Sequence, residues 1–476
     1  MAFISIHYVM FLFIVFFLYY TVSLIYRRLI LLLASIFFIS TFSVSFLLYA
    51  LFITAINFFA AKYIYNNSNG KKRKVVYITG QIFNIGGLFL FKYINFLLEN
   101  INYVFDWFSL NNITYLKLVI PVGISYYTFQ GISYLYLVYK AKDKPETDFV
   151  SFALYMLFFS KILAGPIERH RKFLPQLKRD IVFESGNISD GIRLFLWGAL
   201  KKVLIADVII VIINSGLRNS DLTGFKTAFV FLLLPVYMYA DFSGYTDMAR
   251  GTGRIFGYTL AMNFNYPLFS RSVSDFWRRW HISLSLWCND FIFNRLLLKR
   301  KKWGKYAFIY AIFVTFLVIG LWHGASFNFI VLGLLQAMVI SIEFLTNKKR
   351  KEFFRRKNKL LVHIISSVMV YLFVAVTLTL FFNATIKETL IFLSGLFNNW
   401  NSFSLRGFDI NEGETVVSFL FILFFLSVEL IAYIKNINIK KLLPAKKTFR
   451  FILYFTALVL IIYFSKYQNV FVYENF

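Results

Sequence analysis

The sequence predicts an all-α, polytopic membrane protein. Its 476 residues are 59% hydrophobic, 21% aromatic and only 16% charged, so the chain is far more apolar than a soluble domain. The apolar residues form long uncharged runs such as Tyr306–Trp322, and a run of about 20 residues is long enough for a helix to cross a bilayer. Clusters of lysine and arginine separate these runs, as in the loops between membrane-spanning helices.

Apolar runs of this kind recur along the whole chain. They lie near residues 8–26, 29–47, 49–65, 75–98, 118–139, 191–213, 225–243, 306–322, 327–346, 360–382, 416–434 and 449–465. From them we expect about 11 to 12 transmembrane helices.

Three segments between these runs are predicted not to cross. Ser151–Gly165 is short and contains Lys161, so we expect a re-entrant or interfacial element. Ser243–Trp280 is rich in glycine, asparagine, proline and arginine, and irregular backbone there must be buried in protein or line an aqueous cavity. The segment from His281 to Lys299 alternates polar and apolar faces, which is typical of an amphipathic helix at the membrane interface.

The formal charge of +28 is spread over the loops. If Arg27 and Arg28 are cytoplasmic, alternating spans place the other basic clusters on the same side and both chain termini outside. These clusters are Lys71–Lys74, Lys140–Lys144, Arg169–Arg179, Lys299–Lys305, Lys348–Lys359 and Lys440–Lys447. Such clusters also contact lipid headgroups. A nucleic-acid-binding protein needs one continuous basic face instead, so no nucleic acid partner is expected.

Several kinds of active site lack their sequence signatures. The single cysteine, Cys288, excludes an intrachain disulfide, and we interpret it as buried packing. The chain has no HExxH, GxxxxGK[ST] or GxSxG motif, and no metal site is predicted. A transporter or lipid-linked polysaccharide flippase would also have many spans. However, neither an internal repeat nor a pair of broken helices in related halves is visible.

Two of the five histidines lie in unusual surroundings. His323 is flanked by apolar runs of membrane-spanning length, and an ionisable side chain at that depth is by default a functional-site hypothesis. A buried neutral imidazole can act as a general base on a hydroxyl. Gly320, Gly324 and Ala325 would leave room for a substrate beside Trp322. The alternative is a histidine that is hydrogen-bonded within a helix bundle.

The second histidine, His281, follows Arg278 and Arg279 and begins the amphipathic segment. Its context is consistent with a structural hydrogen bond as well as with catalysis. Lys201 and Lys202 lie in an apolar run, where lysines usually extend to the interface, although a phosphate-bearing donor could bind them.

Asp241 and Asp247 could be read as a carboxylate pair for acid–base or metal chemistry. We favour a different interpretation, in which they are helix-cap and loop residues that turn the chain and pair with Arg250 or Arg254.

Six motifs resemble, in order, those of the membrane-bound O-acyltransferase (MBOAT) family, over roughly residues 1–400. They are PVGISYYTFQGISYLYLVY from Pro121, FFSKILAGPIERHRKFLPQL from Phe158, GALKKVLIAD from Gly198, YADFSGYTDMARG from Tyr239, NFNYPLFSRSVSDFWRRWHISLSLW from Asn263 and GLWHGASFNFIVLGLLQA from Gly320. The chain is most similar to the bacterial branch that O-acetylates alginate, peptidoglycan and other exported polysaccharides.

The resemblance implies a ring of helices around a thin centre, with His323 as the catalytic histidine and His281 as a second, supporting one. It implies a multi-pass protein of the bacterial plasma membrane that uses an acyl thioester, acetyl-CoA above all, as the donor substrate and has no bound cofactor. Donor-binding candidates are Trp322, Arg278, Arg279, Asp290, Lys201 and Lys202. Relatives work with an extracytoplasmic SGNH-hydrolase-like partner, so the acceptor hydroxyl belongs to a polysaccharide or to that partner.

The chain departs from its polysaccharide-acetylating relatives after the first histidine. Asn289 stands where these relatives have an arginine, and Leu296–Leu298 replace a glycine pair in the following turn. D-alanyl transfer to teichoic acid from a carrier protein is therefore the alternative within the family. We expect residues 1–346 to form the catalytic membrane domain and residues 347–476 to add a basic loop and further spans to the same membrane unit.

Overall fold

The computed structural model describes residues 3–163, 165–218, 224–355, 357–398, 400, 408, 412–437 and 447–467. Every regular element among these residues is a helix, which confirms the all-α class. Seven helices in this part of the chain are long and apolar enough to cross a membrane, namely α3, α4, α11, α15, α16, α17 and α19. The protein is therefore a polytopic membrane protein.

This number is lower than the expected 11 to 12 because several apolar runs form short or interrupted helices. The run at residues 118–139 contributes only the 16 residues of α6 (Ile124–Tyr139), after a left-handed Gly123 with φ +74°. The run at residues 191–213 is interrupted by a π-helical turn, η1 (Lys201–Ala206). Ser151–Gly165 was predicted not to cross, and α7 (Phe149–Leu157) is indeed a nine-residue helix, too short for a span.

The chain divides into two compact units that are interleaved in sequence. Among the described residues, the first contains the chain up to Phe195 and Thr246–Ala261, and the second contains Leu196–Tyr245 and the chain from Met262 onwards. The boundary expected between residues 346 and 347 falls inside helix α16, and that functional division stays a prediction.

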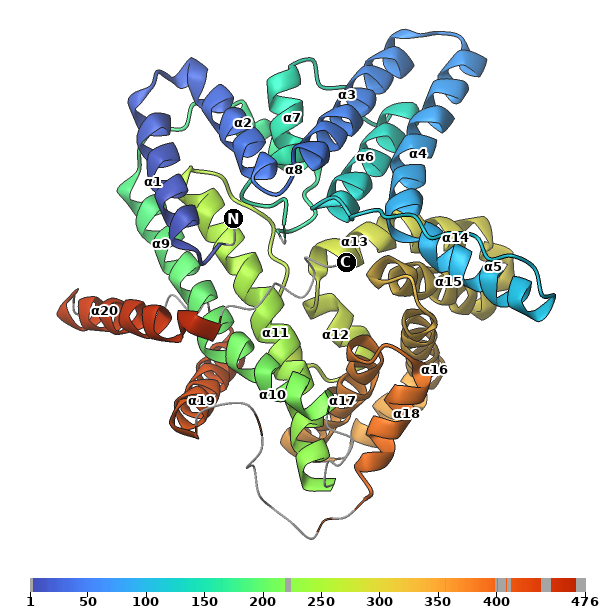
Figure 1. The fold of residues 1–476 in the computed structure, drawn as a ribbon, viewed down its shortest axis with the longest axis vertical. Helices are drawn as coiled ribbons and strands as arrows, with labels where there is room; N and C mark the ends of the chain where they lie inside the picture. Colours follow the sequence, from blue (N-terminus) through green and yellow to red (C-terminus); the bar gives the residue numbers. More distant parts are fainter. Residues whose placement is uncertain are drawn as a thin grey trace. The chain divides into compact units, whose positions relative to one another are not determined.

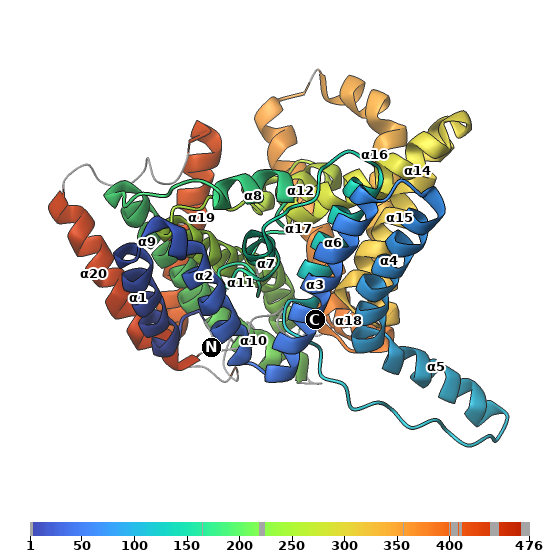
Figure 2. The ribbon, with the colours of Figure 1, turned by 90° about the horizontal axis from the view of Figure 1, so that it is seen from above.

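The first unit is built from α1 to α8, most of α9 and the end of α11 (Figure 1). Besides α6 and α7, its helices are α1 (Ile6–Thr21), α2 (Leu24–Ser40), α3 (Val44–Asn66), α4 (Gly70–Lys92), α5 (Ile94–Trp107), α8 (His170–Leu177) and α9 (Ser185–Leu200). Helices α3, α4 and α6 pack together, and α5 extends away from them (Figure 2). Polar side chains cap the N-termini of several helices by accepting hydrogen bonds from backbone N–H groups, as Ser5 does for α1 and Asn69 for α4.

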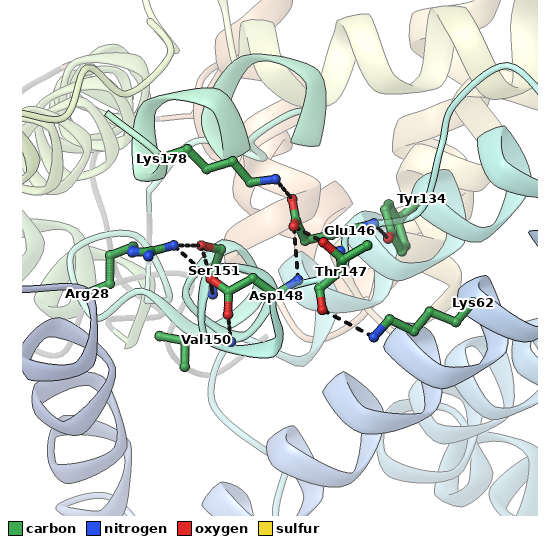
Figure 3. Close-up of polar contacts among 9 residues, drawn as sticks. All are labelled: Arg28, Lys62, Tyr134, Glu146, Thr147, Asp148, Val150, Ser151 and Lys178. Carbon is green, nitrogen blue, oxygen red and sulfur yellow. Dashed lines mark hydrogen bonds and ion pairs between the residues drawn. The ribbon is translucent and has the colours of Figure 1, made fainter. Parts of the chain in front are cut away.

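The basic loop that follows α6 is fastened to this unit by ion pairs and hydrogen bonds (Figure 3). Glu146 pairs with Lys178 at 2.8 Å, and Asp148 pairs with Arg28 at 2.7 Å. Lys62 donates a hydrogen bond to the carbonyl of Thr147. Because these partners come from α2, α3 and the end of α8, the loop holds three helices together.

The second unit is built around the hairpin of α15 and α16 and the short helices α12 to α14 that precede it (Figure 2). Its α-helices are α10 (Asp207–Arg218), α11 (Gly224–Ile255), α12 (Val273–Arg279), α13 (Ile282–Cys288), α14 (Asn294–Lys299), α15 (Lys305–His323), α16 (Phe327–Arg355), α17 (Lys359–Phe382), α18 (Ile386–Gly395), α19 (Glu412–Lys435) and α20 (Lys447–Phe464). Short 3-10 turns lie at Pro267–Phe269, Lys301–Trp303 and Ser465–Tyr467.

Two local predictions about this region need correction. Residues 243–255 were expected to be irregular, but they continue α11, so the irregular segment begins only after Ile255. The amphipathic segment after His281 is helical throughout, as expected, from Ile282 to Lys299. However, a π-helical turn, η3 (Asn289–Phe293), separates its two α-helical parts, α13 and α14.

Candidate active site

His323 is the last residue of α15, where α15 meets α16. The two helices approach each other very closely at two glycines. A Cβ added to Gly320 would lie 2.2 Å from the carbonyl oxygen of Phe329, and one added to Gly333 would lie 2.3 Å from that of Phe316. Glycines let helix backbones approach in this way. The His323 side chain is consequently buried at 5% exposure.

His281 lies between α12 and α13 and is fully buried. Its backbone has φ +42° and ψ +52°, a left-handed conformation that is strained for a residue with a side chain. Asn263 contacts this turn, with its side-chain Oδ1 3.4 Å from Nδ1 of His281 and 3.0 Å from the amide nitrogen of Ser283.

The structure brings the two predicted histidines together around one indole. The ring of Trp322 lies 5.6 Å from that of His281 and 5.0 Å from that of His323, measured between centroids. Phe242 closes another side of His281 at 4.8 Å. Burial lowers the pKa of His281 well below its usual value and the nearby His323 imidazole lowers it further, so this ring is neutral near pH 7.

Helix α16 also holds the short helix α12 that leads to His281. The Glu343 carboxylate accepts hydrogen bonds from the amides of Val273 and Ser274 at 2.7 and 2.9 Å. Seven residues earlier, Gln336 accepts one from the Trp277 indole at 3.0 Å. Because α16 packs against α15 as well, a single helix supports the segments that carry both histidines.

The arginines of α12 differ in their surroundings. Arg278 is exposed, with its guanidinium 3.9 Å from Asp275. Arg279 is bound within the fold, where it pairs with Asp275 at 3.1 Å, donates to the carbonyl of Asn265 and lies over the Tyr433 ring. Asp290 is exposed on the π-helical turn η3.

Lys202 is fully buried in an ion triad. Its Nζ lies 2.7 Å from a carboxylate oxygen of Asp207 and 2.7 Å from one of Asp241. The neighbouring Lys201 donates to the Ser243 hydroxyl at 2.8 Å. Both lysines belong to the π-helical turn η1, which aims them at α11.

The interpretation of Asp241 as a cap or loop residue is wrong, because Asp241 lies inside α11 and pairs with a lysine. Asp247 is also inside α11, but it pairs with Arg250 at 3.2 Å, which agrees with the predicted partner.

Sequence reasoning did not identify Asn263, Gln336 or Glu343 as site residues. A signal was present for Gln336 and Glu343, since polar side chains inside an apolar run of membrane-spanning length are unusual. Asn263 had only its place in a polar, proline-containing stretch.

The fold and this buried pair of histidines define a helical membrane protein with a candidate site for acid–base chemistry. The profile of the membrane-bound O-acyltransferase family, MBOAT, matches residues 141–387. The chain belongs to this family.

Known relatives act on several cell-envelope polymers. The chain is 32% identical over 329 residues to the probable alginate O-acetylase AlgI of Pseudomonas aeruginosa. This alignment covers 68% of this chain and 62% of the relative. It is 32% identical over 375 residues to the peptidoglycan O-acetyltransferase of Helicobacter pylori, covering 73% and 70%. It is 31% identical over 251 residues to the teichoic acid D-alanyltransferase of Bacillus subtilis, covering 50% and 62%. The match thus spans less than two thirds of the Pseudomonas aeruginosa protein.

Proposed function

We propose that this protein is an O-acyltransferase of the bacterial plasma membrane. It moves an acyl group, acetyl in the first instance, from a cytoplasmic thioester across the membrane to a hydroxyl of an exported polysaccharide or of an extracytoplasmic SGNH-hydrolase-like partner. The family and the named activities of the relatives support this class of reaction. The observation that carries the proposal is the pair of buried imidazoles, His281 and His323, which both lie next to the Trp322 indole.

The reaction requires a base and a leaving thiol. The acceptor hydroxyl attacks the thioester carbonyl carbon while His323 takes the hydroxyl proton. The C–S bond then breaks, and the departing thiolate receives that proton, so His323 is regenerated. A water-poor site favours this transfer because the thioester is shielded from hydrolysis.

The surroundings of the basic side chains guide our proposal for donor binding. Arg278 is exposed and has a carboxylate only at 3.9 Å, so it is our first candidate for the phosphates of acetyl-CoA. Lys202 is a weaker candidate, since two carboxylates already hold its Nζ. Trp322, which lies next to both imidazoles, forms a wall of the proposed site and stays a candidate for donor binding.

A teichoic acid D-alanyltransferase is the second candidate. It is favoured by the similarity to the Bacillus subtilis protein, which extends over half of this chain. The two candidates share the chemistry and differ in the acyl group, and labelled acetyl-CoA supplied to the purified protein separates them. Incorporation of label supports the acetyl donor.

Replacing the proposed base tests the function. The His323→Ala variant should lose the protein-dependent acyl esters of cell-surface polymers, because no other group in the proposed step removes the hydroxyl proton. Alkali-released acetate from purified envelopes measures the ester, with the amount of protein followed by immunoblot.

The matched control is His7→Ala, which alters an exposed histidine of α1 and should keep the full ester content. Normal ester in His323→Ala cells at a normal protein level would exclude the proposed function.

A further inference from the structure

Asn263 contacts three consecutive residues around His281, although it lies 18 residues earlier in the chain. Its backbone carbonyl accepts a hydrogen bond from the amide of Ile282 at 3.0 Å. Its side-chain Oδ1 accepts another from the amide of Ser283 at 3.0 Å and lies 3.4 Å from Nδ1 of His281. Asn263 itself is fully buried.

The contact with Ser283 identifies the amide atom that faces His281. A backbone N–H can only donate, so the atom it points to is the carbonyl oxygen of the Asn263 side chain. This oxygen can only accept. The hydrogen bond to the imidazole therefore requires a proton on Nδ1, which leaves the lone pair of the neutral ring on Nε2.

The same residue supports the strained backbone of His281. A left-handed conformation costs on the order of 1–3 kcal/mol for a residue with a side chain and persists only where neighbouring contacts impose it. The amides of Ile282 and Ser283, directly after His281, are both bound by Asn263. Asn263 thus holds both the backbone and the ring of His281, through its side-chain oxygen and its backbone carbonyl.

We propose that Asn263 is a positioning residue that selects the Nδ1–H tautomer of His281 and so makes Nε2 a hydrogen-bond acceptor within the site. His281 then accepts a hydrogen bond from the incoming hydroxyl, while His323 takes its proton. The role in transfer rests on the proposed function, whereas the tautomer itself does not. The ring of His281 lies against the aromatic side chains of Phe242 and Trp322 and is hydrogen-bonded to the backbone of His281 itself, and burial and then the charge of a protonated His323 lower the pKa of His281.

The tautomer can be measured on the full-length chain in detergent micelles. Histidine is labelled with ¹³C and ¹⁵N, the His281 signals are assigned from their disappearance in His281→Gln, and ring chemical shifts distinguish the two neutral tautomers. We expect the Nδ1–H form in the wild type and a shift towards the Nε2–H form in Asn263→Ala. Wild-type His281 in the Nε2–H form, or an Asn263→Ala spectrum unchanged at His281, overturns the proposal.

Two further variants serve as controls for this test. Asn265→Ala changes a half-buried asparagine two residues away and should leave the His281 signals as they are, because Asn265 contacts this turn through its backbone. Asn263→Asp keeps an oxygen facing both Ser283 and His281, so it should keep the proton on Nδ1 even if the alanine variant does not fold. Loss of that proton in Asn263→Asp contradicts the proposal.

Acyl-ester measurements on the same variants separate the two proposals. If His323→Ala keeps its ester, the proposed function fails while the tautomer result is still decided by the spectra. If His323→Ala loses its ester and Asn263→Ala keeps the wild-type amount, the function survives and the positioning role of Asn263 is rejected.

Discussion

The basic side chains near the candidate site differ in how closely carboxylates pair with them. Lys202 has two carboxylate partners at 2.7 Å and no exposed surface, whereas Arg278 keeps 72% of its side chain exposed. A buried charge that loses its partner costs far more free energy than an exposed one. Lys202 is therefore expected to matter first for stability, and Arg278 for binding an external group.

Replacing Lys202 by methionine tests this assignment. The Lys202→Met variant removes the lysine that pairs with two buried carboxylates, which should lower the free energy of unfolding by about 3–5 kcal/mol. Thermal unfolding of the purified full-length protein in detergent measures the loss. Lys74→Met, at an exposed position of α4, should unfold like the wild type. An unchanged unfolding temperature with weaker acetyl-CoA binding would instead favour Lys202 as a donor ligand.

Among the elements, α16 has the largest influence on the candidate site. It approaches α15 through Gly320 and Gly333, and it caps and holds α12 through Glu343 and Gln336. The positions of His323 and His281 are therefore coupled through one helix. A change in the spacing of α15 and α16 should reach both histidines.

Adding one methyl group at Gly333 tests this coupling. Its Cβ would lie 2.3 Å from a backbone oxygen of α15, so the helices must separate, at a cost of about 1–3 kcal/mol. We expect Gly333→Ala to lower both the unfolding temperature and the acyl-ester content. In Gly86→Ala the new methyl group meets only a side chain at 4.0 Å, and the variant should be neutral or slightly more stable. Equal behaviour of the two variants would rule out a tight α15–α16 contact.

On the scale of the whole molecule, the distribution of basic residues predicts the orientation in the membrane. The basic loop after α6 and the cluster at Lys348–Lys359 should face the cytoplasm, together with the donor. In the proposed reaction, this orientation would bring a thioester from inside and a hydroxyl from outside together at His323.

Reporter fusions measure the orientation directly. A fusion after Asn102 should be active outside the cell and one after Asn358 inside, because an excess of lysine and arginine keeps a loop in the cytoplasm. Alkaline phosphatase and green fluorescent protein report the two sides. The reverse pattern would move the proposed donor entry to the opposite face.

Composition was sufficient for the membrane class and the motifs for the family, and Arg250 was among the expected partners of Asp247. The catalytic roles of His281 and His323 stay predictions. Hydropathy, motif spacing and pairs one helical turn apart are properties of neighbouring residues, so they can be read along the chain. Seven long spans are found among the described residues, and the sequence alone does not show where a left-handed glycine or a π-helical turn shortens an apolar run.

Only the tertiary structure brought Asn263 to His281, placed His281 beside the Trp322 indole and joined Lys202 to Asp241. These contacts link residues far apart in sequence, and they depend on which faces of the helices pack together. Composition and spacing along one helix do not specify that packing, since in a membrane it depends on the fit of side chains between helices.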